Sequence, residues 1–121
     1  MDLKKERIRK YGEVFTPHHV VADMCDMLEK ESPCAFEPAT TYLEPTCGDG
    51  AFVLEILRRK FARCRIRKEY TVSLMSIYAM EIQPDNVQAT IENVKAFCRG
   101  YFTPTKEEEQ IIEDPRWGWK W

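Results

Sequence analysis

Two short segments of the 121-residue chain carry residues whose types and spacing suit the binding of a nucleoside. The first is the turn Gly48-Asp49-Gly50, where glycine lets the backbone adopt positive φ and approach a ligand closely. The N–H groups at the start of a following helix can face a negative group. The second is Glu81, which ends an apolar run and can accept hydrogen bonds from both hydroxyls of a ribose. A carboxylate there repels a 2′-phosphate, so the expected ligand is a plain nucleoside. On spacing alone, a tight turn and an unrelated surface glutamate remain the alternative.

The elements that must position these segments alternate between helix and strand. Apolar periodicity predicts a helix over 17–30, a second after Gly50, and a third from Pro84 that stops at Gly100. Between them lie a short strand at Tyr42-Leu43 and a buried parallel strand over 72–80. This order predicts an α/β fold with parallel strands and flanking helices, in which ligands bind beyond the carboxyl ends of the strands. The length suits one domain over 1–121.

The two ends of the chain differ from this pattern. Residues 1–11 form a basic N-terminal arm, read as a solvated, frayed helix or as a segment that contacts phosphates. Thr16 suits the N-cap of the first helix, and Pro17 suits its first helical position. Residues 101–121 form a charged, Trp-rich tail, in which 104–114 is either a short helix or a linker. We expect its three tryptophans to cover sheet surface or to make a protein contact, including self-association, with base stacking as the alternative.

Three motifs occur in the order typical of one enzyme family. The segment 12–17, Gly-Glu-Val-Phe-Thr-Pro, resembles the N-terminal motif of the N6-adenine DNA methyltransferases of restriction–modification systems. The segment 43–52 is similar to their glycine-rich loop for S-adenosylmethionine (SAM), and 78–82 resembles their second-strand motif with its acidic end. The resemblance implies an incomplete Rossmann-like, SAM-dependent methyltransferase fold, with DNA as the partner of the complete enzyme.

The resemblance also implies a role for each matching residue. Phe15, Thr16 and Pro17 would flank the methionine end of SAM, and Glu81 would bind the ribose hydroxyls while Ile82 lies against the adenine. The wall and floor under the amino acid and ribose would be formed by Glu44, Pro45, Cys47, Gly48 and Gly50. Simple helix capping is an alternative role for Thr16 and Pro17, and a small buried side chain is one for Cys47.

The chain also departs from this family. Its catalytic loop is an (Asp/Asn/Ser)-Pro-Pro-(Tyr/Phe) tetrapeptide that holds the flipped adenine, and no such tetrapeptide occurs in the sequence. The nearest string, 114–117, has Arg116 in place of the second proline. We therefore assign no catalytic residue and expect cofactor binding without independent turnover. The alternatives are a non-catalytic SAM-binding or structural module that assembles with a partner and, less favoured, a methyltransferase that acts on a substrate other than DNA.

Composition excludes several other classes. A formal net charge of −2 is too small for a protein held on DNA by charge alone. Five cysteines without a CxxC pair favour reduced thiols over a zinc site or disulfides, and we expect no metal. No apolar run approaches the roughly 20 residues that cross a bilayer, so we expect no membrane contact. The N-terminus has no signal-peptide pattern, which favours the cytoplasm.

Overall fold

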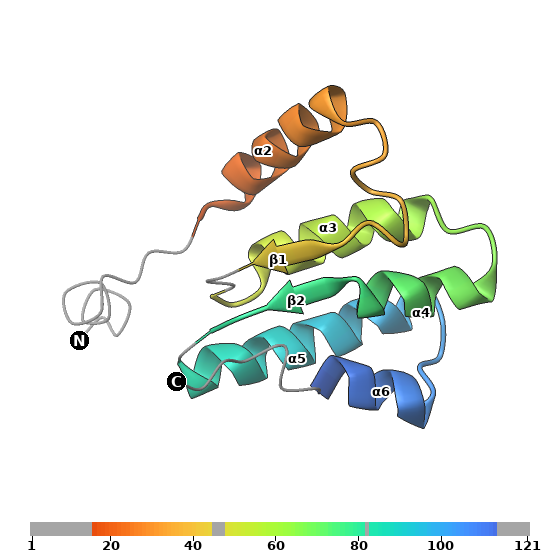
Figure 1. The fold of residues 1–121 in the computed structure, drawn as a ribbon. Helices are drawn as coiled ribbons and strands as arrows, with labels where there is room; N and C mark the ends of the chain where they lie inside the picture. Colours follow the sequence, from red (N-terminus) through yellow and green to blue (C-terminus); the bar gives the residue numbers. More distant parts are fainter. Residues whose placement is uncertain (1–15, 45–47, 82, 114–121) are drawn as a thin grey trace, which may run out of the picture.

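The computed structural model describes residues 16–44, 48–81 and 83–113, which fold as a mixture of helices and strands (Figure 1). In chain order the elements are α2 (His18–Glu31), β1 (Tyr42–Glu44), α3 (Ala51–Ala62), α4 (Arg67–Met75), β2 (Ile77–Ala79), α5 (Pro84–Arg99) and α6 (Lys106–Glu113). The helices expected over 17–30, after Gly50 and from Pro84 are confirmed. Of the two alternatives for 104–114, the short helix is correct, because α6 lies within that range. None of the described helices is long and apolar enough to cross a membrane.

The two strands pair in parallel, as predicted. Tyr42, Leu43 and Glu44 lie opposite Ile77, Tyr78 and Ala79. The Met80 N–H donates to the Glu44 carbonyl at 2.8 Å, so the ladder continues to the carboxyl end of both strands. Both arrows in Figure 1 point the same way, so the carboxyl ends of β1 and β2 lie at the same end of the sheet.

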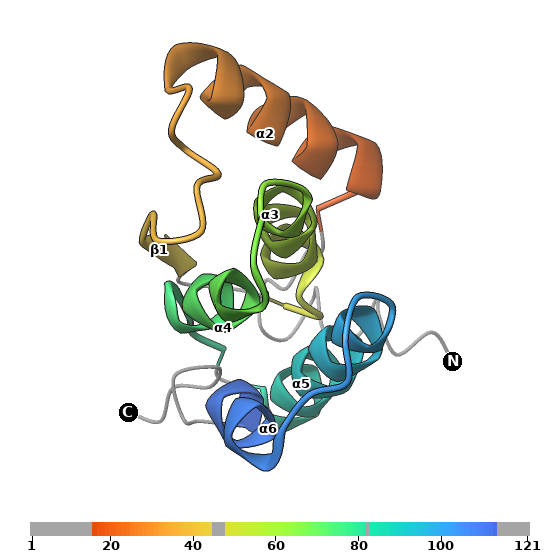
Figure 2. The same ribbon diagram turned by 90° about the vertical axis from the view of Figure 1, so that its right-hand side faces the viewer.

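The sheet is covered by helices on one face. Ile77 and Ala79 are fully buried and belong to the same hydrophobic core as Leu57 of α3 and Val94 of α5. Figures 1 and 2 show α3 and α5 together on this side of the sheet. The core extends to an aromatic cluster around Phe61, whose ring lies 4.9–5.9 Å from its neighbours Tyr70, Phe97, Tyr101 and Phe102. Helix α3 is thus the central support of the fold.

Ion pairs fasten α2 to α3. The Arg59 guanidinium donates to Asp26 Oδ1 at 2.6 Å and to Glu29 Oε1 at 3.3 Å on α2. It also donates to Glu55 Oε2 at 2.6 Å on its own helix. Glu55 is buried, and its bonds to Arg58 and Arg59 outweigh desolvation, so its pKa is lowered. This network fastens the middle and the second half of α2 to α3, the helix that follows the glycine turn.

A buried lysine holds the loop that leads into β1. The Lys60 ammonium donates to the carbonyl oxygens of Glu37 at 2.7 Å, Pro38 at 3.0 Å and Thr40 at 2.5 Å. The side chain is fully buried, and desolvation lowers its pKa to about 8. Three carbonyl oxygens satisfy all three of its donors, so one side chain of α3 fixes the path of the loop before the first strand.

Two local predictions were wrong. The buried strand expected over 72–80 is only three residues long, and residues 72–75 of that run belong to α4. The Glu69 carboxylate caps this helix by accepting the N–H groups of Arg65 at 2.9 Å and Ile66 at 3.2 Å. Thr16 is not the N-cap of the first helix either. Pro17 holds that position in an extended conformation, and its carbonyl accepts the Val20 and Val21 N–H groups.

Candidate functional site

The glycine turn adopts the conformation that glycine alone adopts without strain. Gly48 has φ of 56° and Gly50 has φ of 95°. Gly50 is also the N-cap of α3, and its carbonyl accepts the Leu54 N–H at 2.8 Å. The turn therefore leads directly into α3, and it brings the first N–H groups of that helix, which have no partner within the helix itself, to the carboxyl ends of the strands.

Two side chains of α5 hold this turn through hydrogen bonds to its backbone. The Thr90 hydroxyl donates to the Gly48 carbonyl at 3.1 Å, and the Asn93 amide donates to the Asp49 carbonyl at 3.2 Å. A Cβ atom at Gly50 would lie 3.1 Å from the Thr90 methyl group, closer than ordinary contact. The absence of a side chain at Gly50 thus allows the turn to pack directly on α5.

Glu81 lies directly after β2, on the same side of the fold. Its carboxylate accepts the Gln83 N–H at 3.4 Å and the Asn86 side-chain amide at 3.3 Å, and the side chain is partly exposed. Both donors belong to the start of α5, where the helix dipole favours an acidic group. Helix α5 therefore contacts both segments that the sequence singled out.

Sequence reasoning did not identify the three supporting residues of α5. Asn86, Thr90 and Asn93 are spaced four and three residues apart, so they lie on one face of the helix. Asn86 and Thr90 are buried. The detectable signal was this polar stripe beside the apolar stripe of Val87, Ile91 and Val94, because buried polar side chains in a helix need specific partners.

The remaining predicted site residues are only partly described. Glu44 is partly exposed at the end of β1, opposite Ala79, and thus reaches the same sheet edge as the turn and Glu81. Phe15, Pro45, Cys47 and Ile82 lie outside the described residues, as do the basic arm and the tryptophans of the tail.

Thr16 meets the glycine turn in a cleft of about 510 Å³. Its walls come from the start of α2, the turn, α3 and α5, and it is lined by Thr16, His18, Asp49, Ala51, Leu54, Glu55, Arg58, Asn93 and Phe97. The structure thus brings the first and second motifs together. Glu44, Gly48, Gly50 and Glu81 do not line this cleft, so it covers only one side of the predicted cofactor site.

The described residues contain no group of three or more His, Cys, Asp or Glu side chains placed to hold a metal ion. Burial raises the pKa of the Cys25, Cys64 and Cys98 thiols, with Cys98 reaching about 12. These three thiols are therefore protonated and poorly nucleophilic at neutral pH.

A parallel strand pair, a glycine turn opening a helix and an acidic residue after the second strand are elements from which α/β proteins build nucleoside-cofactor sites. The sequence is similar to the type II methyltransferase M.VspI of Vibrio sp. (strain 343), with 27% identity over an alignment of 131 residues. The match covers 98% of this chain, which spans 28% of the length of that curated relative. No protein-family profile matches the sequence, and no solved structure matches it. The similarity supports a distant relationship to methyltransferases.

Proposed function

We propose that this chain is the SAM-binding portion of a DNA adenine-N6 methyltransferase of the restriction–modification type. The observation that carries the proposal is the common support of the glycine turn and Glu81 by α5 at the carboxyl edge of a parallel strand pair. The similarity to a type II methyltransferase over 98% of the chain supports the same conclusion.

In this proposal each end of the cofactor has its own support. Glu81 accepts hydrogen bonds from the ribose hydroxyls, for which its partly exposed carboxylate is suitably placed. Gly48 and Gly50 let the backbone approach the ribose and amino acid, with Glu44 as a wall, while Thr16 and Pro17 flank the methionine end. SAM supplies an activated methyl group on a sulfonium. In the complete enzyme, alignment of that methyl with adenine N6 supplies most of the catalysis.

Calorimetric titration of SAM and S-adenosylhomocysteine tests the proposal. We expect micromolar binding to the wild-type chain and at least a tenfold loss in Glu81→Gln, since hydrogen bonds to a charged acceptor contribute about 1.5–3 kcal/mol. The control is Glu92→Gln, which removes an exposed carboxylate of α5 that accepts a hydrogen bond from the Gln88 side-chain amide. A folded wild type that binds neither ligand, or a Glu81→Gln variant that binds as well as wild type, would contradict the proposal.

The chain alone is expected not to methylate DNA, because its sequence lacks the family's catalytic tetrapeptide. The measurement is transfer of tritiated methyl from SAM to unmethylated duplex DNA, beside a reaction without protein. Incorporation above that background would show that another segment supplies the catalytic groups.

A non-catalytic module that assembles with a partner is the second candidate function. The observation that favours it is the exposure of two apolar side chains, Leu43 and Tyr78, which lie opposite each other in the two strands. A methyltransferase acting on another substrate is less favoured, because the segment 12–17 precedes the glycine loop as it does in the DNA enzymes.

A further inference from the structure

The cleft between the start of α2, the glycine turn, α3 and α5 has an apolar floor. Ala51, Leu54 and Phe97 line it, and all three are partly buried side chains that pack against the hydrophobic core. Its volume of about 510 Å³ lies within the range of about 300–1,000 Å³ that is typical of ligand pockets. Glu81 does not line this cleft, so a ribose bound there would leave the apolar floor uncovered.

The rim of the cleft carries one exposed carboxylate, that of Asp49. Glu55 is the other acidic side chain of the lining, but it is buried and accepts hydrogen bonds from Arg58 at 2.5 Å and from Arg59 at 2.6 Å. The charges of Glu55 and Arg58 therefore offset each other within α3. Asp49 is left to give the rim a negative charge, which favours a basic occupant.

The N-terminal segment joins the structure in the wall of this cleft. Residues 1–15 lie outside the described residues and lead directly into Thr16, which lines the cleft. A chain extends by about 3.3–3.6 Å per residue at most, so the five steps from Tyr11 to Thr16 span up to about 17 Å. A short tether also keeps a segment at an effective concentration in the millimolar range. The basic arm, residues 1–11, is therefore within reach of the cleft at all times.

The basic arm matches the cleft in both charge and apolar side chains. It contains five basic and two acidic side chains, a formal net charge of +3, whereas the whole chain carries −2, so the remainder carries −5. Ile8 and Tyr11 are three residues apart and share one face of a helical turn. Lys10 stands beside them in the sequence. The arm thus offers two apolar side chains for the floor and an ammonium group for the rim.

We propose that the basic arm docks in the cleft of its own chain, with Ile8 and Tyr11 on the apolar floor and Lys10 beside Asp49. Burial of the apolar side chains supplies most of the binding, because an ion pair at an exposed rim contributes little. The docked arm covers Leu54 and closes the outer side of the glycine turn. This inference goes beyond the proposed function and does not depend on it, since it concerns a contact within the free chain.

Zero-length carbodiimide cross-linking of the full chain tests the position of the arm. The reagent joins a carboxylate to an amine in direct contact, so mass spectrometry of peptides should find Asp49 joined to Lys10. Asp23 and Glu31 are exposed carboxylates of α2 outside the cleft and serve as internal controls. Their links to the arm should be at least fivefold less abundant. A mixture of ¹⁵N-labelled and unlabelled chain separates links within one chain from links between copies.

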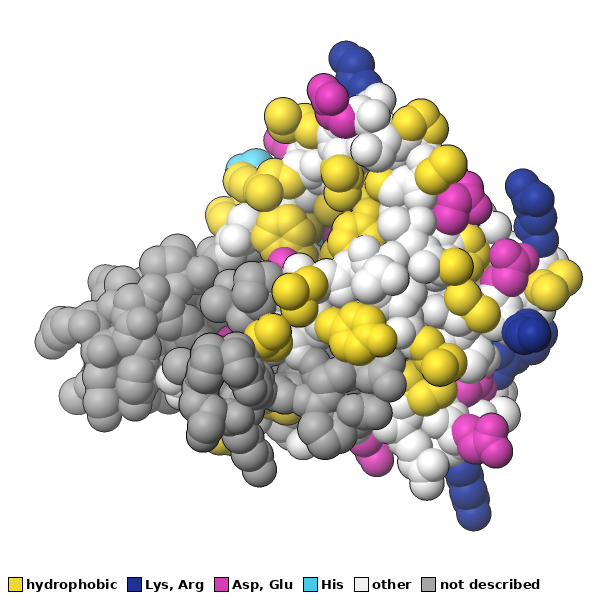
Figure 3. All heavy atoms as spheres, viewed as in Figure 1, with side chains coloured by type: hydrophobic (Ala, Val, Ile, Leu, Met, Phe, Trp, Pro, Cys, Tyr) yellow, Lys and Arg dark blue, Asp and Glu magenta, His cyan; other side chains and the backbone are white. Residues whose placement is uncertain are grey.

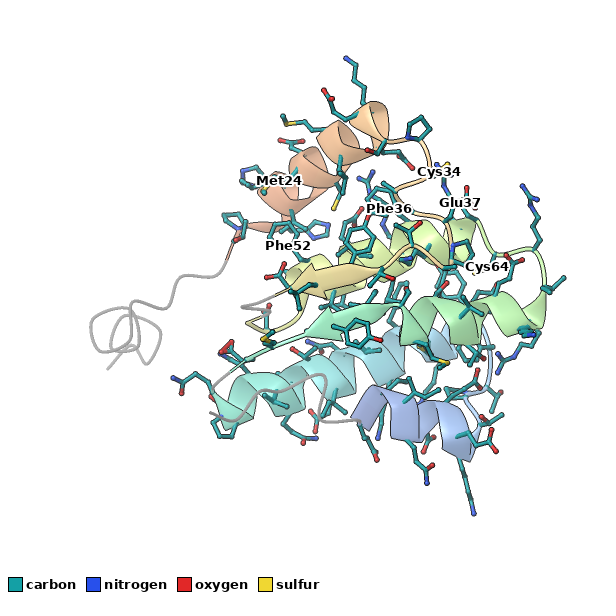
Figure 4. All side chains as sticks on the ribbon, viewed as in Figure 1. Met24, Cys34, Phe36, Glu37, Phe52 and Cys64 are labelled. Carbon is teal, nitrogen blue, oxygen red and sulfur yellow. The ribbon has the colours of Figure 1, made fainter. Side chains whose placement is uncertain are left out.

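Trypsin cleavage after Arg9 measures the protection of the arm, because the protease cuts the undocked form. Tyr11→Ser and Leu54→Asn should each raise the initial rate at least fivefold. Tyr11→Ser changes no described residue, so the test stands even if circular dichroism shows that Leu54→Asn unfolds. The matched control is Met24→Asn, which should be cut like wild type. Met24 is 51% exposed and does not line the cleft, and Figure 4 shows it close to Phe52, between α2 and β1.

The rival location for the arm is the region between α2 and the sheet, where Figure 3 also shows hydrophobic side chains. Loss of protection in Met24→Asn but not in Leu54→Asn would place the arm there and overturn the inference. Equal cleavage of wild type and Tyr11→Ser, or absence of the link from Asp49 to Lys10, would also overturn it. Links only between labelled and unlabelled copies would assign the arm to a second copy and overturn the stated occupant. Both measurements are made without SAM, so their failure is distinct from a failure to bind SAM.

Discussion

Replacement of Gly50 by alanine tests the geometry of the glycine turn directly. At φ of 95° an alanine side chain costs about 1–2 kcal/mol relative to glycine. Its Cβ would also lie 3.1 Å from the Thr90 methyl group, and relief of that contact costs about 1 kcal/mol. We therefore expect Gly50→Ala to lower the free energy of unfolding by about 2–3 kcal/mol, or to lower Tm by about 10 °C for a domain of this size.

The assay is urea unfolding followed by far-UV circular dichroism. Gly100→Ala is the matched control, because Gly100 caps the end of α5 with φ of −73° and needs no positive φ. We expect that control to cost less than about 1 kcal/mol.

A double-mutant cycle separates the two causes. Thr90→Ala alone should cost about 1 kcal/mol through loss of its hydrogen bond to the Gly48 carbonyl. Combined with Gly50→Ala it should cost about 1 kcal/mol less than the sum of the single changes, since the crowded methyl group is gone. Strict additivity would refute the packing of the turn on α5, and a loss below about 0.5 kcal/mol for Gly50→Ala would refute its positive φ.

Two buried charged side chains outside the site, Lys60 and Glu108, should make the stability of the fold depend on pH. The pKa of Lys60 is about 8 in the folded chain and near 10.5 unfolded, so the unfolded state binds more protons between these values. Relative to Lys60→Met, wild-type stability should therefore rise from pH 8 to 10.5 in urea titrations, and a flat difference would contradict the burial. The pKa of Glu108 is lowered to about 2, chiefly by its hydrogen bonds from Arg67. Its contribution, on the order of 2 kcal/mol, is full above pH 4.5 and is lost as pH falls toward 2. Acid unfolding of Glu108→Gln should lack this component, and identical acid transitions in both proteins would refute it.

The sequence allowed prediction of the elements with strong periodicity or distinct turn chemistry. The long apolar stripe from Pro84 marked α5, and the paired glycines marked the start of α3. The parallel pairing followed from the order of the elements, because a helix between two strands returns the chain in the same direction.

The apolar run 72–80 was misread because its length and composition fit a strand and a buried helix segment equally well. The decisive interactions lie far apart in sequence. Arg67 donates to Glu108 Oε1 at 2.6 Å and Thr71 donates to Glu108 Oε2 at 2.7 Å, which joins α4 to α6 across about forty residues. No local sequence pattern predicts such a contact. Strand β2 therefore comprises only the three residues that pair with β1.

The polar stripe of α5 connects the two halves of the candidate site more closely than either motif suggests. Asn86 holds Glu81, while Thr90 and Asn93 hold the glycine turn, so the separation of the two segments is set by the rise of one helix. A rigid helix keeps that separation constant, whereas two independent loops would have to be ordered when the ligand binds. In the proposed SAM site, this helix face supports both segments without itself having to touch the ligand, and substitutions there should change the affinity for SAM by moving both segments together.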